Sequence, residues 1–186
     1  MVRHTIAGLA AVALVAGFAV AAELKSGPQT GEKVPGPFHP LNINGEKAGQ
    51  KNCLYCQNGP NPVAVVFARS TEEPAVAKLL KKLDDATAAH TKCEMGSFAV
   101  FLTDDDKAPE QLKGLVKNQD LKKLIVAVDN PAGPEKYNIS KDADVTVVLY
   151  TDHVVKANHA FKKGELDDAK IEEVVKDVAK ILPEQK

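Results

Sequence analysis

The sequence is poor in the features that recruit nucleic acids or hold a mature protein in a membrane. It has no tryptophan, three tyrosines and six phenylalanines, and its 24 Lys and Arg residues are balanced by 25 Asp and Glu residues. Charges of both signs are interspersed, so no basic patch is available to contact phosphates, and we expect no nucleic-acid partner. The one long apolar run lies at the start of the chain. We therefore expect no stable membrane span once that run is removed.

The apolar run has the layout of a signal peptide. A short basic start over residues 1–4 precedes apolar residues 6–20, and Ala19-Val20-Ala21 offers the small residues that signal peptidase recognises. The run is shorter than the about 20 residues that a spanning helix prefers, although an uncleaved anchor is the other interpretation. We expect a signal peptide over residues 1–22 and a periplasmic or secreted protein.

The remaining chain is long enough for one domain with a substantial core. Residues 23–37, rich in Gly, Pro and Lys, predict an extended, poorly ordered leader, and residues 38–186 predict a single domain. A continuous apolar run typical of a buried strand occupies residues 63–68, and largely apolar segments over residues 98–102, 124–128 and 145–150 indicate further strands. Helical spacing of apolar residues indicates helices over residues 74–90, 109–118 and 167–182, and residues 153–161 are expected to pair with the last apolar run as a hairpin.

Two short motifs flank the predicted hairpin. Tyr137-Asn138-Ile139 precedes it, and Phe161-x-x-Gly164-Glu165-Leu166 leads into the last helix. With the order of elements, these motifs resemble the thioredoxin-like superfamily, particularly its redoxin (peroxiredoxin-like) branch, over residues 34–182. The resemblance implies an α/β, thioredoxin-like three-layer sandwich. Its central mixed sheet would have helices on both faces and an antiparallel hairpin at the C-terminal side.

The sequence departs from this family at two positions. The family's nucleophilic cysteine follows the first core strand, but residues 69–73 contain no cysteine. The family's cis-proline, which lies against the redox dithiol, falls on Val145, with Thr146 after it as in the family. A peroxidase would require the missing cysteine, so the sequence argues against that activity.

The candidate chemistry rests on the three cysteines of the chain. Cys53 and Cys56 have the Cys-x-x-Cys spacing, which indicates redox chemistry, a disulfide or half of a metal site. In the first hypothesis, the protein is a thiol–disulfide oxidoreductase of the cell envelope that acts on protein thiols or disulfides without a cofactor. Cys53 would then attack a substrate disulfide, and Cys56 would resolve the mixed disulfide.

The second hypothesis is a non-catalytic thioredoxin-fold binding or scaffold module whose cysteines form a structural disulfide or a zinc site. A helix that follows a buried parallel strand ends near the start of that strand, so His90 and Cys93 are predicted at the same end of the sheet as Cys53 and Cys56. Such a set of ligands suits tetrahedral zinc. In the alternative interpretation, His90 is a partly buried histidine and Cys93 is a small buried hydrophobe. Cys53 and Cys56 then form a disulfide, either with each other or with Cys93.

Overall fold

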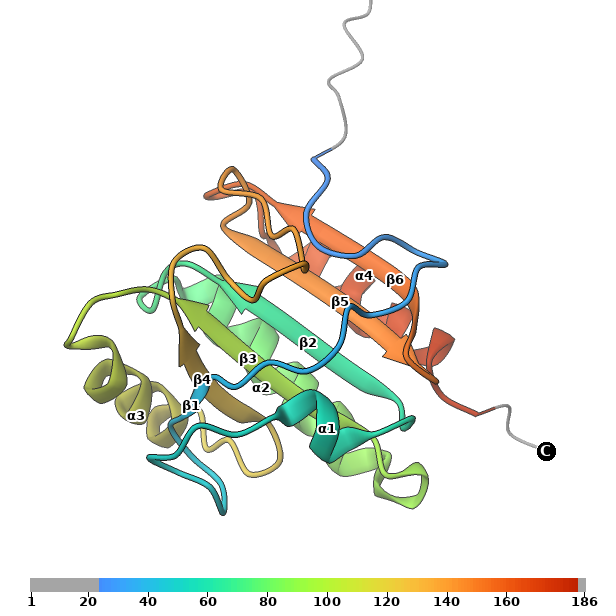
Figure 1. Cartoon of the computed structure of the whole chain (residues 1–186), viewed down its shortest axis with the longest axis horizontal. Helices are drawn as coiled ribbons and strands as arrows, with labels where there is room; N and C mark the ends of the chain where they lie inside the picture. Colours follow the sequence, from blue (N-terminus) through green and yellow to red (C-terminus); the bar gives the residue numbers. More distant parts are fainter. Residues whose placement is uncertain (1–23, 184–186) are drawn as a thin grey trace, which may run out of the picture.

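The computed structural model describes residues 24–183, and the expected signal peptide lies outside them. The chain forms a six-stranded mixed sheet in the order β1-β4-β3-β2-β5-β6, with helices on both faces (Figure 1). The strands are β1 (Leu41–Asn42), β2 (Val63–Ala68), β3 (Gly96–Leu102), β4 (Ile125–Asp129), β5 (Val145–Thr151) and β6 (Val154–Phe161). The helices are α1 (Leu54–Asn58), α2 (Pro74–Ala89), α3 (Ala108–Asn118) and α4 (Asp168–Asp177), with 3-10 turns η1 (Thr91–Cys93) and η2 (Val178–Lys180).

The sheet has a parallel core and an antiparallel side. Strands β2, β3 and β4 run parallel, β5 pairs antiparallel with β2, and β6 pairs antiparallel with β5. Every residue of β2 is buried, as expected of a central strand covered on both faces. The hairpin between β5 and β6 turns at Asp152 and His153, whose φ angles of 51° and 61° suit a tight two-residue turn. The α/β class, the parallel core and the hairpin predicted from the sequence are therefore confirmed.

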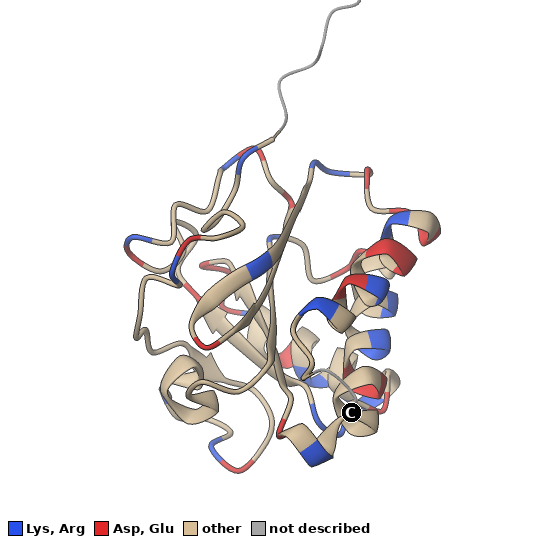
Figure 2. Cartoon of the chain, turned by 90° about the vertical axis from the view of Figure 1, so that its right-hand side faces the viewer, with Lys and Arg blue, Asp and Glu red and all other residues tan. Residues whose placement is uncertain are grey.

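The three longer helices cover one face of the sheet. Strands β2, β3 and β4 succeed one another across the sheet in one direction, so right-handed crossovers place α2 and α3 on the same side. Their outward surface carries charges of both signs (Figure 2), and Lys78 of α2 pairs with Asp168 of α4 at 2.7 Å. No helix within residues 24–183 has the length and apolar character to cross a membrane. A hydrophobic cluster fills the space between these helices and the sheet, and its helical residues include Leu79, Leu80, Leu83, Leu112, Ile171 and Val174.

The other face is covered by α1 and by two segments without regular structure, residues 24–38 and 130–144. Leu54 of α1, Phe38 and Tyr137 belong to one buried cluster on this face. The ring of Phe38 lies 5.0 Å from that of Tyr137 in an edge-on arrangement, and 6.2 Å from that of Phe67 in β2. The Tyr137 hydroxyl donates a hydrogen bond of 2.6 Å to the carbonyl of Gly36, which fastens the two segments together.

Residues 24–37 have no helix and only one isolated β-bridge, between Lys33 and Val154, and they pack against the sheet. Figure 1 shows this segment crossing the front of the sheet. Ser26 is buried, and its hydroxyl lies 2.6 Å from that of Thr146 in β5. The backbone N–H of Gly27 donates to the carbonyl of Asn138 at 3.1 Å. A composition rich in Gly and Pro predicts the lack of regular structure, but it does not exclude packing against distant residues.

Candidate functional site

The Cys-x-x-Cys pair lies at the start of a short helix. Cys53 is the N-cap of α1, and its sulfur accepts a hydrogen bond of 3.1 Å from the backbone N–H of Cys56. The two cysteines are joined by a disulfide, with their Cα atoms 5.2 Å apart. Our sequence analysis did not predict this helix. Leu54, which is 1 % exposed, anchors the helix to the sheet.

The two cysteines differ in their exposure to solvent. Cys56 is exposed, together with the following residue, Gln57. Cys53 is buried, with 9 % of its surface exposed. A reagent in solution therefore reaches the second cysteine of the pair more easily than the first.

An open depression lies beside the disulfide. Its volume is about 860 Å³. Three lysines and one carboxylate contribute to its lining, and Lys122 is partly neutralised by an ion pair of 3.0 Å with Asp120. The balance of charge around the disulfide is therefore positive. The lining consists of Asn42, Gly45, Glu46, Lys47, Asn52, Cys53, Cys56, Gln57, Lys122, Lys123 and Ile125.

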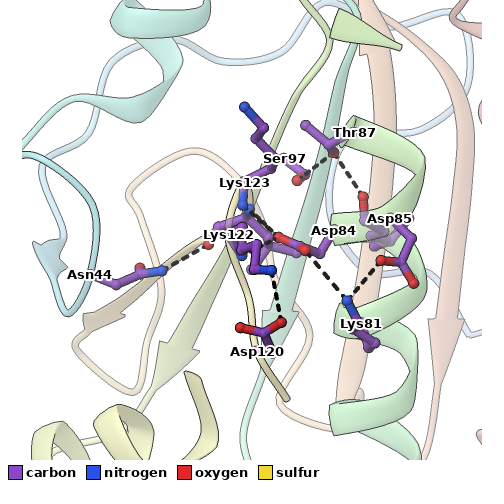
Figure 3. Close-up of polar contacts among 11 residues, drawn as sticks. Asn44, Lys81, Asp84, Asp85, Thr87, Ser97, Asp120, Lys122 and Lys123 are labelled. Carbon is purple, nitrogen blue, oxygen red and sulfur yellow. Dashed lines mark hydrogen bonds and ion pairs between the residues drawn. The ribbon is translucent and has the colours of Figure 1, made fainter. Parts of the chain in front are cut away.

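Lys122 and Lys123, which line one side of this depression, are held in place by Asp84, a buried residue of α2 (Figure 3). One carboxylate oxygen of Asp84 accepts hydrogen bonds from the backbone N–H groups of Lys122, Lys123 and Leu124, at 2.9, 2.6 and 2.8 Å. Three donors converging on one charged oxygen fix the turn that leads into β4. Our sequence analysis did not identify Asp84. Its position four residues after Leu80, on the buried face of the helix, is the signal that could have found it.

Asn44 holds the same turn from the opposite side. Its amide nitrogen donates to the carbonyl of Leu124 at 3.0 Å, and its amide oxygen accepts from the N–H of Val126 at 2.7 Å. In this way the side chain reproduces the hydrogen bonds of a neighbouring strand. Asn44 and Asp84, 40 residues apart in the sequence, jointly fix the backbone that carries Lys122 and Lys123.

The structure places His90 and Cys93 near the same end of the sheet as the disulfide, but it does not assemble the four residues. Asn58 of α1 lies against Gly96, at the start of β3, which confirms the shared end. Cys93 packs against the cluster on the α2 face, whereas Leu54 belongs to the opposite face. The thiol of Cys93 donates a hydrogen bond of 3.2 Å to the carbonyl of His90. Among residues 24–183, no group of three or more His, Cys, Asp or Glu side chains is arranged to hold a metal ion.

The opposite end of β2, where the redoxin nucleophile would lie, is organised differently. The guanidinium of Arg69 donates to the carbonyls of Ala143, Pro131 and Ser140 at 3.0, 2.8 and 3.0 Å, and so ties down the loop before β5. Val145 is buried at the start of β5, and no peptide bond between residues 24 and 183 is cis. The six residues of β2 are about 20 Å long and lie between this end and the end that follows α1.

A pair of carboxyl groups lies at this same end. The pKa of Glu73 is raised because its protonated carboxyl can donate a hydrogen bond to the Asp144 carboxylate, and partial burial and the negative charge of Asp144 act in the same direction. Glu73 is the N-cap of α2 and precedes Pro74, and Asp144 precedes β5. The two carboxyls therefore occupy the neighbourhood in which redoxins keep their cysteine and cis-proline, and they do not offer a sulfur nucleophile.

Known proteins share this fold. By sequence, no family model and no curated protein matches the chain. By structure, it is similar to a candidate protein disulfide isomerase from Bacteroides thetaiotaomicron, with a TM-score of 0.64 and 13 % identity over 86 % of this chain and 94 % of that one. It is also similar to the peroxidoxin BcpB of Mycobacterium tuberculosis, with a TM-score of 0.58 and 12 % identity over 87 % of this chain and 100 % of that one.

A third similar structure is a secreted disulfide oxidoreductase of Mycobacterium tuberculosis that is homologous to DsbE of E. coli. Its TM-score is 0.54, with 12 % identity over 76 % of this chain and 94 % of that one. At these identities, the likeness establishes the fold and leaves the chemistry to the residues of this chain. The protein therefore has the thioredoxin-like fold, and its Cys-x-x-Cys disulfide lies toward the end of the central strand β2 opposite Arg69.

Proposed function

We propose that the protein carries out thiol–disulfide exchange through Cys53 and Cys56, with protein thiols or disulfides as substrates. One observation carries the proposal: the disulfide opens a helix and presents an exposed cysteine beside an open depression. A redox disulfide must be reachable by a second sulfur, since exchange proceeds by direct attack of a thiolate. Lys47 and Lys123 add positive charge nearby, which favours the thiolate over the thiol.

The length of the closed loop also favours a chemical role over a stapling role. The two cysteines are separated by 3 positions. In the chain-entropy model, so short a loop yields about 2 kcal/mol of stability, roughly half of what a loop of about 40 residues to Cys93 would yield. A disulfide between Cys53 and Cys56 therefore stabilises the chain less than a disulfide from either cysteine to Cys93 would.

The alternative function is a non-catalytic binding or scaffold module with a structural disulfide. The opposite end of β2 supports this alternative. There the chain has neither cysteine nor cis-proline, and Arg69 fastens the adjacent loop through three hydrogen bonds. A scaffold protein would not need an accessible sulfur, so this alternative does not explain why Cys56 is exposed.

We further propose that the protein works in the periplasm or outside the cell. The start of the sequence supports this, because residues 1–22 combine a basic start, an apolar run and small residues at the end. The similar oxidoreductase of Mycobacterium tuberculosis is a secreted protein. Disulfides persist in such oxidising compartments, where an exchange protein finds its substrates.

The test is the catalysed reduction of insulin disulfides by dithiothreitol. We expect the wild-type protein to accelerate the reaction at least ten-fold over the uncatalysed rate. The double variant Cys53→Ser/Cys56→Ser should lose this acceleration and lose about 2 kcal/mol of stability at most. The matched control is Cys93→Ala, which removes the third thiol and should keep the activity. A wild-type protein without activity would reject the exchange function and leave the structural disulfide as the role of this pair.

A further inference from the structure

We infer that Cys56, and not Cys53, forms the mixed disulfide with the substrate. This assignment rests on the proposed exchange function and reverses the order expected from the sequence, in which the first cysteine attacks. Two independent features of the structure support it: the difference in exposure between the two cysteines, and the hydrogen bond received by only one of the two sulfurs.

Exposure decides which sulfur can be attacked. In exchange, the incoming thiolate must approach the attacked sulfur from the side opposite to the leaving sulfur. Cys53 is 9 % exposed and is followed by Leu54, which is 1 % exposed and faces the core. Cys56 and Gln57 are exposed on the outer side of the same helix. Both cysteines border the depression, but Cys56 presents much more of its surface to a substrate than Cys53 does.

The hydrogen bond decides which sulfur leaves most easily. The sulfur of Cys53 already accepts the backbone N–H of Cys56 at 3.1 Å. A hydrogen bond to a charged acceptor is roughly twice as strong as a neutral one, so this contact strengthens as negative charge develops on Cys53. The Cys56 sulfur receives no hydrogen bond from residues 24–183 that would assist it as a leaving group in the same way.

The reaction then follows a balanced sequence. A substrate thiolate attacks the Cys56 sulfur, a bond forms between those two sulfurs, the Cys53–Cys56 bond breaks, and Cys53 leaves as a thiolate. A second thiolate of the substrate attacks the substrate sulfur of the mixed disulfide and expels Cys56 as a thiolate. The substrate dithiol has lost two electrons and become a disulfide, and the protein has gained them as a dithiol. In the opposite direction, the Cys56 thiolate attacks the substrate disulfide and expels one substrate sulfur as a thiolate. The Cys53 thiolate then attacks the Cys56 sulfur of the mixed disulfide, re-forms the Cys53–Cys56 bond and expels the second substrate thiolate.

The first experiment compares the two sulfurs separately. In the full chain carrying Cys93→Ala, Cys53→Ser leaves only Cys56, and Cys56→Ser leaves only Cys53. We measure the rate of each with the uncharged disulfide 4,4′-dithiodipyridine, in buffer and in concentrated urea. We expect Cys56 to react at least ten-fold faster in the folded protein, with the two rates converging in urea. Equal rates in the folded protein, or a faster Cys53, would overturn the assignment.

The second experiment keeps both cysteines and therefore does not depend on how a cysteine variant folds. The oxidised Cys93→Ala protein is mixed with glutathione and quenched with acid, and the adduct is located by fragmentation between Leu54 and Tyr55. Glutathione on Cys56 supports the assignment, and glutathione on Cys53 refutes it. Neither measurement depends on turnover. Loss of insulin reductase activity with the adduct on Cys56 would reject the proposed function alone, and activity with the adduct on Cys53 would reject this assignment alone.

Discussion

Replacing Asp84 with alanine would remove a single carboxylate that holds the turn before β4. Its oxygen accepts the backbone N–H groups of Lys122, Lys123 and Leu124 at 2.6 to 2.9 Å. Asp84 is 2 % exposed, and its second oxygen lies 3.8 Å from the ammonium of Lys81. The substitution therefore leaves three donors without their acceptor, and water cannot enter freely to replace it.

The expected magnitude follows from the burial of each donor. A buried donor left unsatisfied costs about 1–3 kcal/mol, and a partly exposed donor that recovers water costs about 1 kcal/mol or less. The bond to Leu124 is buried, and the bonds to Lys122 and Lys123 are partly buried. We expect Asp84→Ala to lose about 3–5 kcal/mol. Asp84→Asn keeps an acceptor oxygen and loses the charge, and we expect a loss of about 1–2 kcal/mol.

Urea unfolding measures these losses, with the m-value as a check that the unfolding reaction is unchanged. The matched control is Asp85→Asn. Asp85 is the neighbouring residue of the same helix and pairs with the same Lys81, but its side chain is 62 % exposed. We expect the control to change stability by about 0.5 kcal/mol or less. Hydrogen exchange should show lost protection at residues 122–124 in Asp84→Ala only. A loss equal to that of the control, with protection retained, would refute this account of the turn.

Two further predictions concern acidity and processing. Because Asp144 raises the pKa of Glu73, folding favours the protonated form, and the stability that this provides below pH 4.5 is lost as the pH rises through the folded-state pKa. Melting temperatures from pH 4 to pH 8 should therefore fall less steeply for Glu73→Gln than for the wild type or the control Glu72→Gln, and parallel curves would contradict the prediction. Intact mass of protein from its native envelope should show cleavage after Ala21 or Ala22, and a retained N-terminus in the membrane fraction would contradict export.

The sequence was sufficient to predict the core of the sheet, because strands buried on both faces consist of unbroken apolar runs. Residues 63–68 were predicted as a strand, and β2 spans the same residues. The ends of helices were harder to predict. The last helix was expected to reach residue 182, but α4 ends at Asp177 and a 3-10 turn continues over residues 178–180. The apolar face persists through both kinds of turn, so periodicity does not distinguish them.

The site was only partly predictable. The Cys-x-x-Cys spacing identified the sulfur pair, but the five residues of α1 are too few to show a helical period, so the helix that Cys53 caps could not be found from the pattern. The exposure of Cys56 depends on how Leu54 packs against the sheet, which no local pattern records. Asp84 was missed for a related reason. An aspartate on a leucine-rich helix face only interrupts the apolar pattern, and the sequence does not show the three backbone N–H groups that bind it.

The segment that crosses the front of the sheet imposes an order on assembly. Ser26 contacts Thr146 and Asn158, which are 120 and 132 positions further along the chain. During synthesis, residues 24–37 are made long before either partner exists, and they can dock only after β5 and β6 have paired. Because contacts at such separation must overcome a large loop-closure entropy, they form late in folding. We therefore expect the described residues that are translated first to complete the fold last, and until then to stay open to any factor that handles the nascent chain.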